Sequence, residues 1–169
     1  MAKPEEKPAI DTFGRVPEYI DMLEDAREKG ICLLDIDGYR ERSSKDILNE
    51  FGGWILARTL YPYPNTQPRE SGIEGHVMIF PERHITSPRD MNSSDILAAW
   101  QLFNDASDIY GAKTGALFLR YSNEDNHAGA GATIEHLHMH VLAPYLDPET
   151  GRVPGANSPE SKQVKLWVG

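Results

Sequence analysis

Apolar and polar residues alternate most regularly near residue 140, in the run Ile134-Glu-His-Leu-His-Met-His-Val-Leu142. Side chains along an extended strand point to opposite faces in turn, so this period of two predicts a strand. Apolar side chains would occupy one face of the strand, and the other face would carry three imidazoles: His136, His138 and His140. Half of the chain's six histidines would therefore share one sheet face.

Apolar residues at helical spacing predict two helices. The first covers residues 17–29, with Pro17 in its first turn and Gly30 after its end. The second begins near residues 92–95, where polar side chains can cap the backbone, and it ends at Gly111. We expect one stripe of this second helix to be buried: Ile96, Trp100, Phe103 and Tyr110.

Short apolar runs between turn residues predict further strands at 31–36, 54–59, 75–80 and 115–121. The last of these and the histidine strand should form an antiparallel pair. The sum is an α+β fold over residues 17–146, a mostly antiparallel sheet with packed helices. Residues 1–16 predict a loose tail, and residues 147–169 predict a surface loop followed by a short closing strand at 164–168.

Composition narrows the classes of function. The 169 residues are 40% apolar, enough for one domain with a core, and their net charge of −9 disfavours a protein that binds nucleic-acid phosphates. No apolar run reaches the roughly 20 residues that cross a membrane. The single cysteine, Cys32, excludes an intrachain disulfide. These features predict a cytoplasmic protein with a small ligand and no nucleic-acid or membrane partner.

Three interpretations of the histidine row compete. Histidines two residues apart on a strand are separated by about 6.5–7 Å, so one strand cannot aim all three at an ion whose bonds are near 2 Å. A metal site would need ligands from elsewhere, such as His84, Glu82 or Glu135. A second interpretation is a set of buried core histidines held by hydrogen bonds.

The third interpretation is nucleophilic. An imidazole with a pKa of about 6.5 is largely neutral at cytoplasmic pH and can attack phosphorus without a separate strong base. Phosphoryl or nucleotidyl transfer also needs donors for phosphate oxygens. The loop 129–133, just before the histidine strand, offers small residues with accessible backbone N–H groups and the hydroxyl of Thr133.

The segment His136-Leu-His-Met-His-Val-Leu142 fits the pattern His-φ-His-φ-His-φ-φ at every position, where φ is apolar. It resembles the signature of the histidine triad (HIT) family. Two further segments are similar to family motifs: residues 75–85, a strand ending in Pro-x-x-His-Ile, and Tyr121-Ser-Asn-Glu124. The resemblance covers about residues 54–144. It implies a HIT-like fold that forms a two-fold homodimer through the long helix, with Ile109, Trp100 or Leu97 as candidate contacts, and an edge strand.

The resemblance also implies roles for four histidines. His138 would attack the α-phosphate of a purine nucleotide conjugate and form a covalent nucleotidyl-histidine. The backbone carbonyl of His136 would help to fix the tautomer of His138, His140 would help to protonate the leaving group, and His84 would be a fourth histidine near the site. Further residues are predicted to contact substrate, although the last two fit a core role equally well: Asn123, Gly131, Thr133, Trp54 and Leu56.

The chain departs from the family pattern in three places. The loop from Asn123 to His136 is about two residues longer than in the commoner branches, which, like the next departure, bears on the branch of the family. Ala132 stands where many hydrolases of the family carry Gln, which leaves the branch of the family open. The frequent N-terminal metal ligands of the family are missing, because we expect Cys32 to have no partner nearby. We therefore expect no metal ligand and no cofactor for the chemistry.

The expected reaction breaks phosphoanhydride or phosphoramidate bonds of nucleotides. Water as acceptor would make the protein a hydrolase, whereas phosphate or a sugar phosphate would make it a phosphorylase or transferase. Two other functions stay open. One is a nucleotide-binding or sensing protein with little turnover, and the other is a metal-dependent hydrolase that uses the histidine row.

Overall fold

A computed structural model describes residues 17–60, 73–110, 116–121 and 134–144, together with Glu149. Along this part of the chain two helices come before three strands, and a long helix comes before two more strands. One 3-10 turn lies before the first strand and another lies before the long helix. In chain order the elements are α1 (Pro17–Lys29), α2 (Ile36–Ser43), η1 (Ser44–Asp46), β1 (Ile47–Phe51), β2 (Trp54–Arg58), β3 (Ile73–Pro81), η2 (Pro88–Asp90), α4 (Ser93–Ile109), β4 (Ala116–Arg120) and β5 (His138–Pro144). The predicted tail and the predicted C-terminal loop and strand lie outside the described residues, apart from Glu149.

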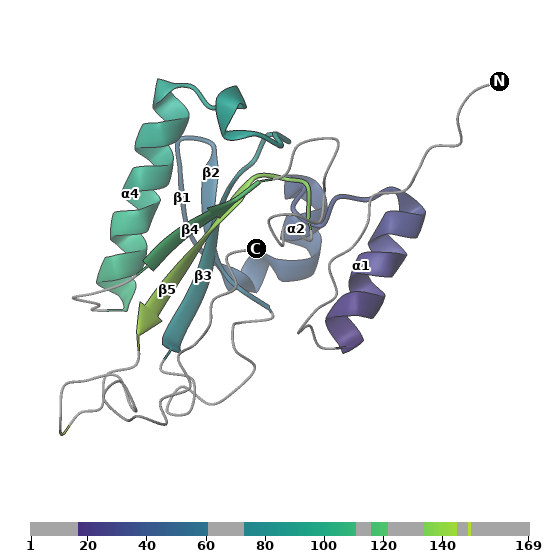
Figure 1. Cartoon of the computed structure of the whole chain (residues 1–169), viewed down its shortest axis with the longest axis horizontal. Helices are drawn as coiled ribbons and strands as arrows, with labels where there is room; N and C mark the ends of the chain where they lie inside the picture. The colour runs from purple at the N-terminus through teal and green to yellow at the C-terminus, as the bar shows by residue number, and fades with distance from the viewer. Residues whose placement is uncertain (1–16, 61–72, 111–115, 122–133, 145–148, 150–169) are drawn as a thin grey trace, which may run out of the picture.

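The strands form one sheet in the order β1-β2-β3-β5-β4, and every neighbouring pair within the described residues is antiparallel (Figure 1). This confirms the predicted antiparallel sheet and the predicted pairing of β4 with the histidine strand. Strand β5 lies between β3 and β4, so its histidines have neighbouring strands on both sides.

The two faces of the sheet carry different elements. Helix α4 covers one face, where Leu137, Met139 and Val141 join the larger core cluster as the alternation predicted. The other face carries a smaller cluster beneath α2 that includes Tyr39 and Phe80. The imidazoles lie on this second face, because His136 contacts the ring of Phe80. Within the described residues, no helix is long and apolar enough to span a membrane.

The start of α4 agrees with the prediction. The side chain of Asn92 accepts bonds from the backbone N–H groups of Ser94 and Asp95, and the Asp95 carboxylate accepts from the backbone of Asn92. The predicted buried stripe is confirmed only in part: Phe103 and Tyr110 are partly buried against the core cluster, and Ile96 and Trp100 are not. The residues of α4 that face the sheet are mostly small, whereas Ile96 and Trp100 are each 57% exposed. The buried residues are Asp95, Ala98, Ala99, Leu102 and Ala106.

Two segments before β2 also differ from the prediction. Residues 31–36 do not form a strand: the Asp35 N–H bonds to the Cys32 carbonyl in a turn, and α2 begins at Ile36. A short apolar run fits a buried turn as well as a strand, and here Leu34 is buried beneath the sheet. The polar stretch after α2 contains the unpredicted strand β1. It joins β2 through Gly52 and Gly53, whose φ values of 58° and 77° suit a two-residue hairpin turn.

Position 75 of β3 requires glycine, because a side chain from α4 packs directly against its backbone. A Cβ atom at Gly75 would overlap the ring of Tyr110, the residue that caps the C-terminal end of α4. The end of the long helix therefore rests directly on the backbone of β3, next to His76.

Candidate functional site

The three histidines of the row do not form one group. Strand β5 begins at His138, and His136 lies just before it in a bend. All three imidazoles are buried, but the contacts of His136 differ from those of the other two. Two clusters result, and each also contains residues from other parts of the chain.

The first cluster, here called the imidazole group, consists of His76, His138 and His140. His76 Nε2 lies 2.8 Å from His140 Nδ1, a hydrogen bond between β3 and β5. The rings of His138 and His140 meet edge to face with centroids 4.9 Å apart. The exposed fractions of the three residues are only 6%, 4% and 7%. A buried set of imidazoles in contact can exchange protons without competing water.

The tautomer of His138 follows from its partner. Its Nδ1 atom lies 2.8 Å from the backbone oxygen of His136. A carbonyl oxygen can only accept, so Nδ1 carries the hydrogen and donates it. The lone pair of the neutral ring is then on Nε2, the atom available for attack on an electrophile. This is the carbonyl contact that the resemblance implied.

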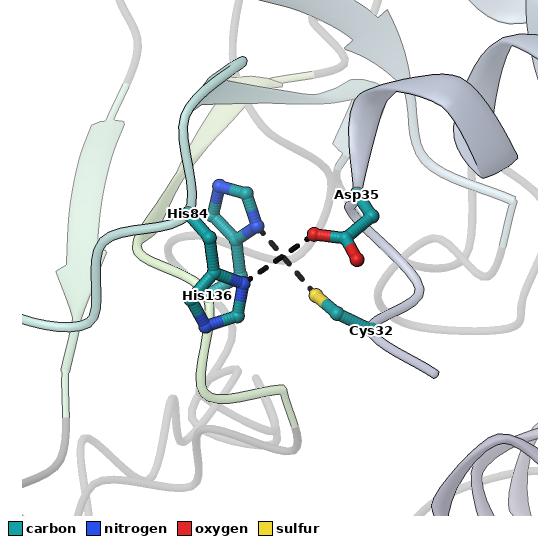
Figure 2. A group of neighbouring side chains, drawn as sticks. All are labelled: Cys32, Asp35, His84 and His136. Carbon is teal, nitrogen blue, oxygen red and sulfur yellow. Dashed lines mark hydrogen bonds and ion pairs between the residues drawn. The ribbon is translucent and has the colours of Figure 1, made fainter. Parts of the chain in front are cut away.

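The second cluster, here called the mixed donor group, consists of Cys32, Asp35, His84 and His136. Figure 2 shows the four side chains pointing toward a common centre from three separate segments. Their ligand-type atoms all lie within 4.8 Å of one another. Cys32 Sγ is 3.6 Å from His136 Nδ1, and His84 Nδ1 is 3.5 Å from Asp35 Oδ1. The expectation that Cys32 has no partner nearby is therefore wrong.

Burial keeps two members of the mixed donor group neutral at pH 7. Burial lowers the pKa of His136 to about 4, although a hydrogen bond to the Pro81 carbonyl opposes the shift. His136 donates from Nε2 to that carbonyl at 2.9 Å, which leaves the lone pair of its Nδ1 facing the cluster. Burial also raises the pKa of the Cys32 thiol. A sulfur, a carboxylate and two imidazoles are donor types that suit zinc.

Comparison with known proteins gives the family. Residues 67–146 match the family profile of the HIT domain. This stretch contains the whole imidazole group and, from the mixed donor group, His84 and His136. This chain contains a HIT domain. The HIT family comprises nucleotide hydrolases and nucleotidyl transferases.

One of three similar solved structures, the first named here, supports the HIT fold. A HIT family hydrolase from Clostridium thermocellum is 24% identical, with 69% of this chain and 92% of that chain covered and a TM-score of 0.52. A HIT family hydrolase from Legionella pneumophila is 18% identical over 58% of this chain and 80% of its own, with a TM-score of 0.44. Plasmodium falciparum diadenosine triphosphate hydrolase is 12% identical over 62% of this chain and 65% of its own, with a TM-score of 0.47. No curated protein matches the chain.

The HIT resemblance implied a fourth histidine near the site, and the structure places His84 in the mixed donor group with His136. His84 faces Asp35 and the ring of His136, and its side chain is 44% exposed. Trp54 and Leu56 are fully buried in the core cluster beneath α4, on the face opposite the imidazoles. Both therefore have a core role, and a contact with substrate stays a prediction. The other predicted substrate contacts, Asn123, Gly131 and Thr133, lie outside the described residues.

Sequence reasoning missed His76 as a member of the site. It lies on β3 opposite Leu142, two residues from the position that pairs with His140, so it is a diagonal neighbour on the same face. The alternation His76, Met78, Phe80 carried this signal, but only the strand register connects it to His140. Asp35 was missed as well, because the segment around it was assigned to a strand.

Proposed function

We propose that this HIT protein is a nucleotide hydrolase or nucleotidyl transferase in which His138 attacks the α-phosphate of a purine nucleotide conjugate. The observation that carries the proposal is the 2.8 Å bond from His138 Nδ1 to the His136 carbonyl. With the hydrogen on Nδ1, Nε2 of this buried imidazole is the nucleophile. The same bond stabilises the positive charge that the ring acquires on attack.

The proposed first step forms a bond between His138 Nε2 and phosphorus. The bond from phosphorus to the leaving oxygen or nitrogen breaks, and its electron pair stays with the leaving group. His140, the ring next to His138, supplies the proton that the leaving group needs. His76 holds His140 through their 2.8 Å bond and so sets which nitrogen of His140 faces the substrate. Substrates of this chemistry have phosphoanhydride or phosphoramidate bonds.

The second step transfers the nucleotidyl group from His138 to an acceptor. Water as the acceptor gives a hydrolase, and phosphate or a sugar phosphate gives a phosphorylase or transferase. Every step uses imidazole nitrogens, so no cofactor is required in the reacting group. A zinc ion held by Cys32, Asp35, His84 and His136 would supply a structural anchor. We propose a cytoplasmic setting, in keeping with a single cysteine and no intrachain disulfide.

The test is intact-mass spectrometry after rapid mixing with adenosine polyphosphates and with an adenosine phosphoramidate, in the presence of a chelator. We expect a transient mass increase of one nucleotidyl group in the native chain and none in His138→Ala. Asp37→Ala is the control, because Asp37 is an exposed side chain in α2 and belongs to neither cluster. Added imidazole should partly restore turnover to His138→Gly.

Two results would contradict the proposal. Tight nucleotide binding without an adduct or turnover would instead support a nucleotide-binding or sensing protein. Turnover that disappears with chelator, with no adduct at any time, would support a metal-dependent hydrolase.

We further propose that the chain forms a two-fold homodimer through α4 and β4. The outward face of α4 carries large apolar side chains, with Leu97 70% and Trp100 57% exposed. Strand β4 is at the edge of the described sheet, with Leu117 and Leu119 partly exposed. Light scattering after gel filtration should give twice the chain mass for the native protein and the chain mass for Trp100→Glu. A monomeric native protein would contradict this proposal.

A further inference from the structure

The short segment after β3, residues 81–85, holds the bend from which β5 begins. The Pro81 carbonyl accepts a hydrogen bond from His136 Nε2 at 2.9 Å, and the Ile85 carbonyl accepts one from the Leu137 backbone N–H at 2.7 Å. The carbonyl of His136 in turn orients the nucleophile. The direction of that carbonyl therefore depends on where the segment 81–85 lies.

Two neighbouring side chains of this segment are held by elements on opposite faces of the sheet. His84 packs against the ring of His136, on the face that carries α2 (Figure 2). The guanidinium of Arg83 instead donates to the Asp95 carboxylate at the start of α4 and to the Asp90 carbonyl at 2.8 Å. Arg83 thus attaches the segment to the face opposite the imidazoles.

Asp95 is a fixed anchor for Arg83. The Asp95 side chain is only 9% exposed, whereas that of Arg83 is 46% exposed. The carboxylate also accepts from the Trp54 indole at 3.0 Å and from the Asn92 backbone at 2.8 Å, which joins the first turn of α4 to the start of β2. A carboxylate with three partners cannot follow a moving arginine, so the ion pair restrains the backbone at Arg83.

We propose that Arg83 is a positioning residue for the nucleophile. Held by Asp95, it fixes the segment 81–85. Two carbonyls of that segment then fix the His136 carbonyl, which orients His138. Arg83 acts from the far face of the sheet, through the backbone rather than on the reacting atoms. The effect on catalysis rests on the proposed function, whereas the restraint on the backbone does not.

The restraint is tested without any nucleotide, by amide hydrogen exchange. The Leu137 N–H bonds to the Ile85 carbonyl, so its exchange rate reports on local opening of the bend. We expect Arg83→Ala to speed this exchange by about 3- to 10-fold, because the variant loses a half-exposed ion pair and one further bond. Exchange in the middle of β5 should not change. Arg83→Lys keeps the charge and should recover part of the protection.

The effect on catalysis is tested by rapid mixing and steady-state assays. Arg83→Ala should slow adduct formation on His138 by about 3- to 10-fold with little change in KM, and Arg83→Lys should recover part of the rate. Asp95→Asn should also slow it, and the two losses should be less than additive because both variants weaken one contact. Arg89→Ala is the matched control, since Arg89 is an exposed arginine in η2 and belongs to neither cluster.

Nitrogen NMR of the His138 ring gives a readout that general destabilisation would not move. The native chain should show one tautomer, with the hydrogen on Nδ1, and Arg83→Ala should show exchange between two tautomers. The urea midpoint of Arg83→Ala should change little, because the arginine of the pair is half exposed.

Three results would overturn the positioning role. A raised KM with an unchanged rate of adduct formation would mean that Arg83 binds substrate. Faster exchange throughout β5 in Arg83→Ala, with a lower urea midpoint, would mean that Arg83 only stabilises the fold. Unchanged exchange at Leu137 would mean that Arg83 does not restrain the bend. A native chain that forms no adduct would count against the proposed function, and the exchange of Leu137 would still decide whether the restraint exists.

Discussion

Replacing Asp95 with alanine should destabilise the domain by about 2–4 kcal/mol. The carboxylate is 6% exposed and accepts three bonds: from Trp54 Nε1 at 3.0 Å, from the Asn92 backbone at 2.8 Å and from Arg83. The variant leaves the indole N–H of a fully buried Trp54 without an acceptor, at a cost of about 1–3 kcal/mol. Loss of the reciprocal cap at the start of α4 adds about 1 kcal/mol. Arg83 is 46% exposed and can turn to water, so it adds little.

The assay is urea unfolding, which should show a lower midpoint with an unchanged slope. Asp95→Asn keeps an acceptor for the indole and should lose about half as much stability. In a double-mutant cycle with Trp54→Phe, the two losses should be less than additive by about 1–2 kcal/mol. A loss below 0.5 kcal/mol for Asp95→Ala, or strict additivity, would refute the reasoning.

The pH dependence of stability tests the hydrogen bonds of Asp95 independently. Burial alone would raise the pKa of Asp95, but the bonds from Asn92, Trp54 and Arg83 outweigh it and leave the pKa lowered. A lowered folded-state pKa means that the stabilisation is complete above the ordinary aspartate pKa of about 4 and is lost as the pH falls below it. The native chain should lose stability over this range more steeply than Asp95→Asn does.

Three further predictions test other parts of the molecule. Burial, with a smaller contribution from Asp46, raises the pKa of Tyr39 to about 12, so about 2–3 kcal/mol of stability should be lost as the pH rises from about 10 to 12. Urea unfolding at alkaline pH should show that Tyr39→Phe abolishes this loss. The same loss of stability in Tyr39→Phe as in the native chain would be inconsistent with it. His76→Phe should lower kcat by about 10- to 100-fold by releasing His140, whereas His76→Gln should recover part of it in steady-state assays; equal activity of His76→Phe and the native chain would exclude the positioning role. Leu102→Ala should cost about 2–5 kcal/mol in urea unfolding, because Leu102 is fully buried between α4 and the sheet; a cost under 1 kcal/mol would mean that α4 relaxes into the space.

Local patterns predicted much of the fold. The alternation around His138 identified β5 and its apolar face, and the Asn92 to Asp95 segment identified the start of α4. These signals succeed because strand alternation and helix caps depend on neighbours in sequence. The predicted stripe of α4 was wrong at Ile96 and Trp100, because the helix approaches the sheet mainly through alanines, whose small side chains contribute little to an apolar pattern.

Sequence patterns predicted only part of the candidate site. The sequence placed His136, His138 and His140 on one face, but not the bend that separates His136 from β5. His76 joins His140 through the register of β3, and Cys32 reaches His136 across 104 positions of sequence. Both contacts depend on tertiary packing, which no short-range pattern encodes.

The contact between Gly75 and Tyr110 bears on how this protein can change over evolution. Any side chain at position 75 would collide with the aromatic ring that ends α4, so a mutation there alone should be rejected by selection. A smaller residue at position 110 would relieve the collision and make larger residues at position 75 acceptable. Substitutions at these two positions should therefore appear together among descendants of this sequence, and glycine should persist wherever the tyrosine is kept.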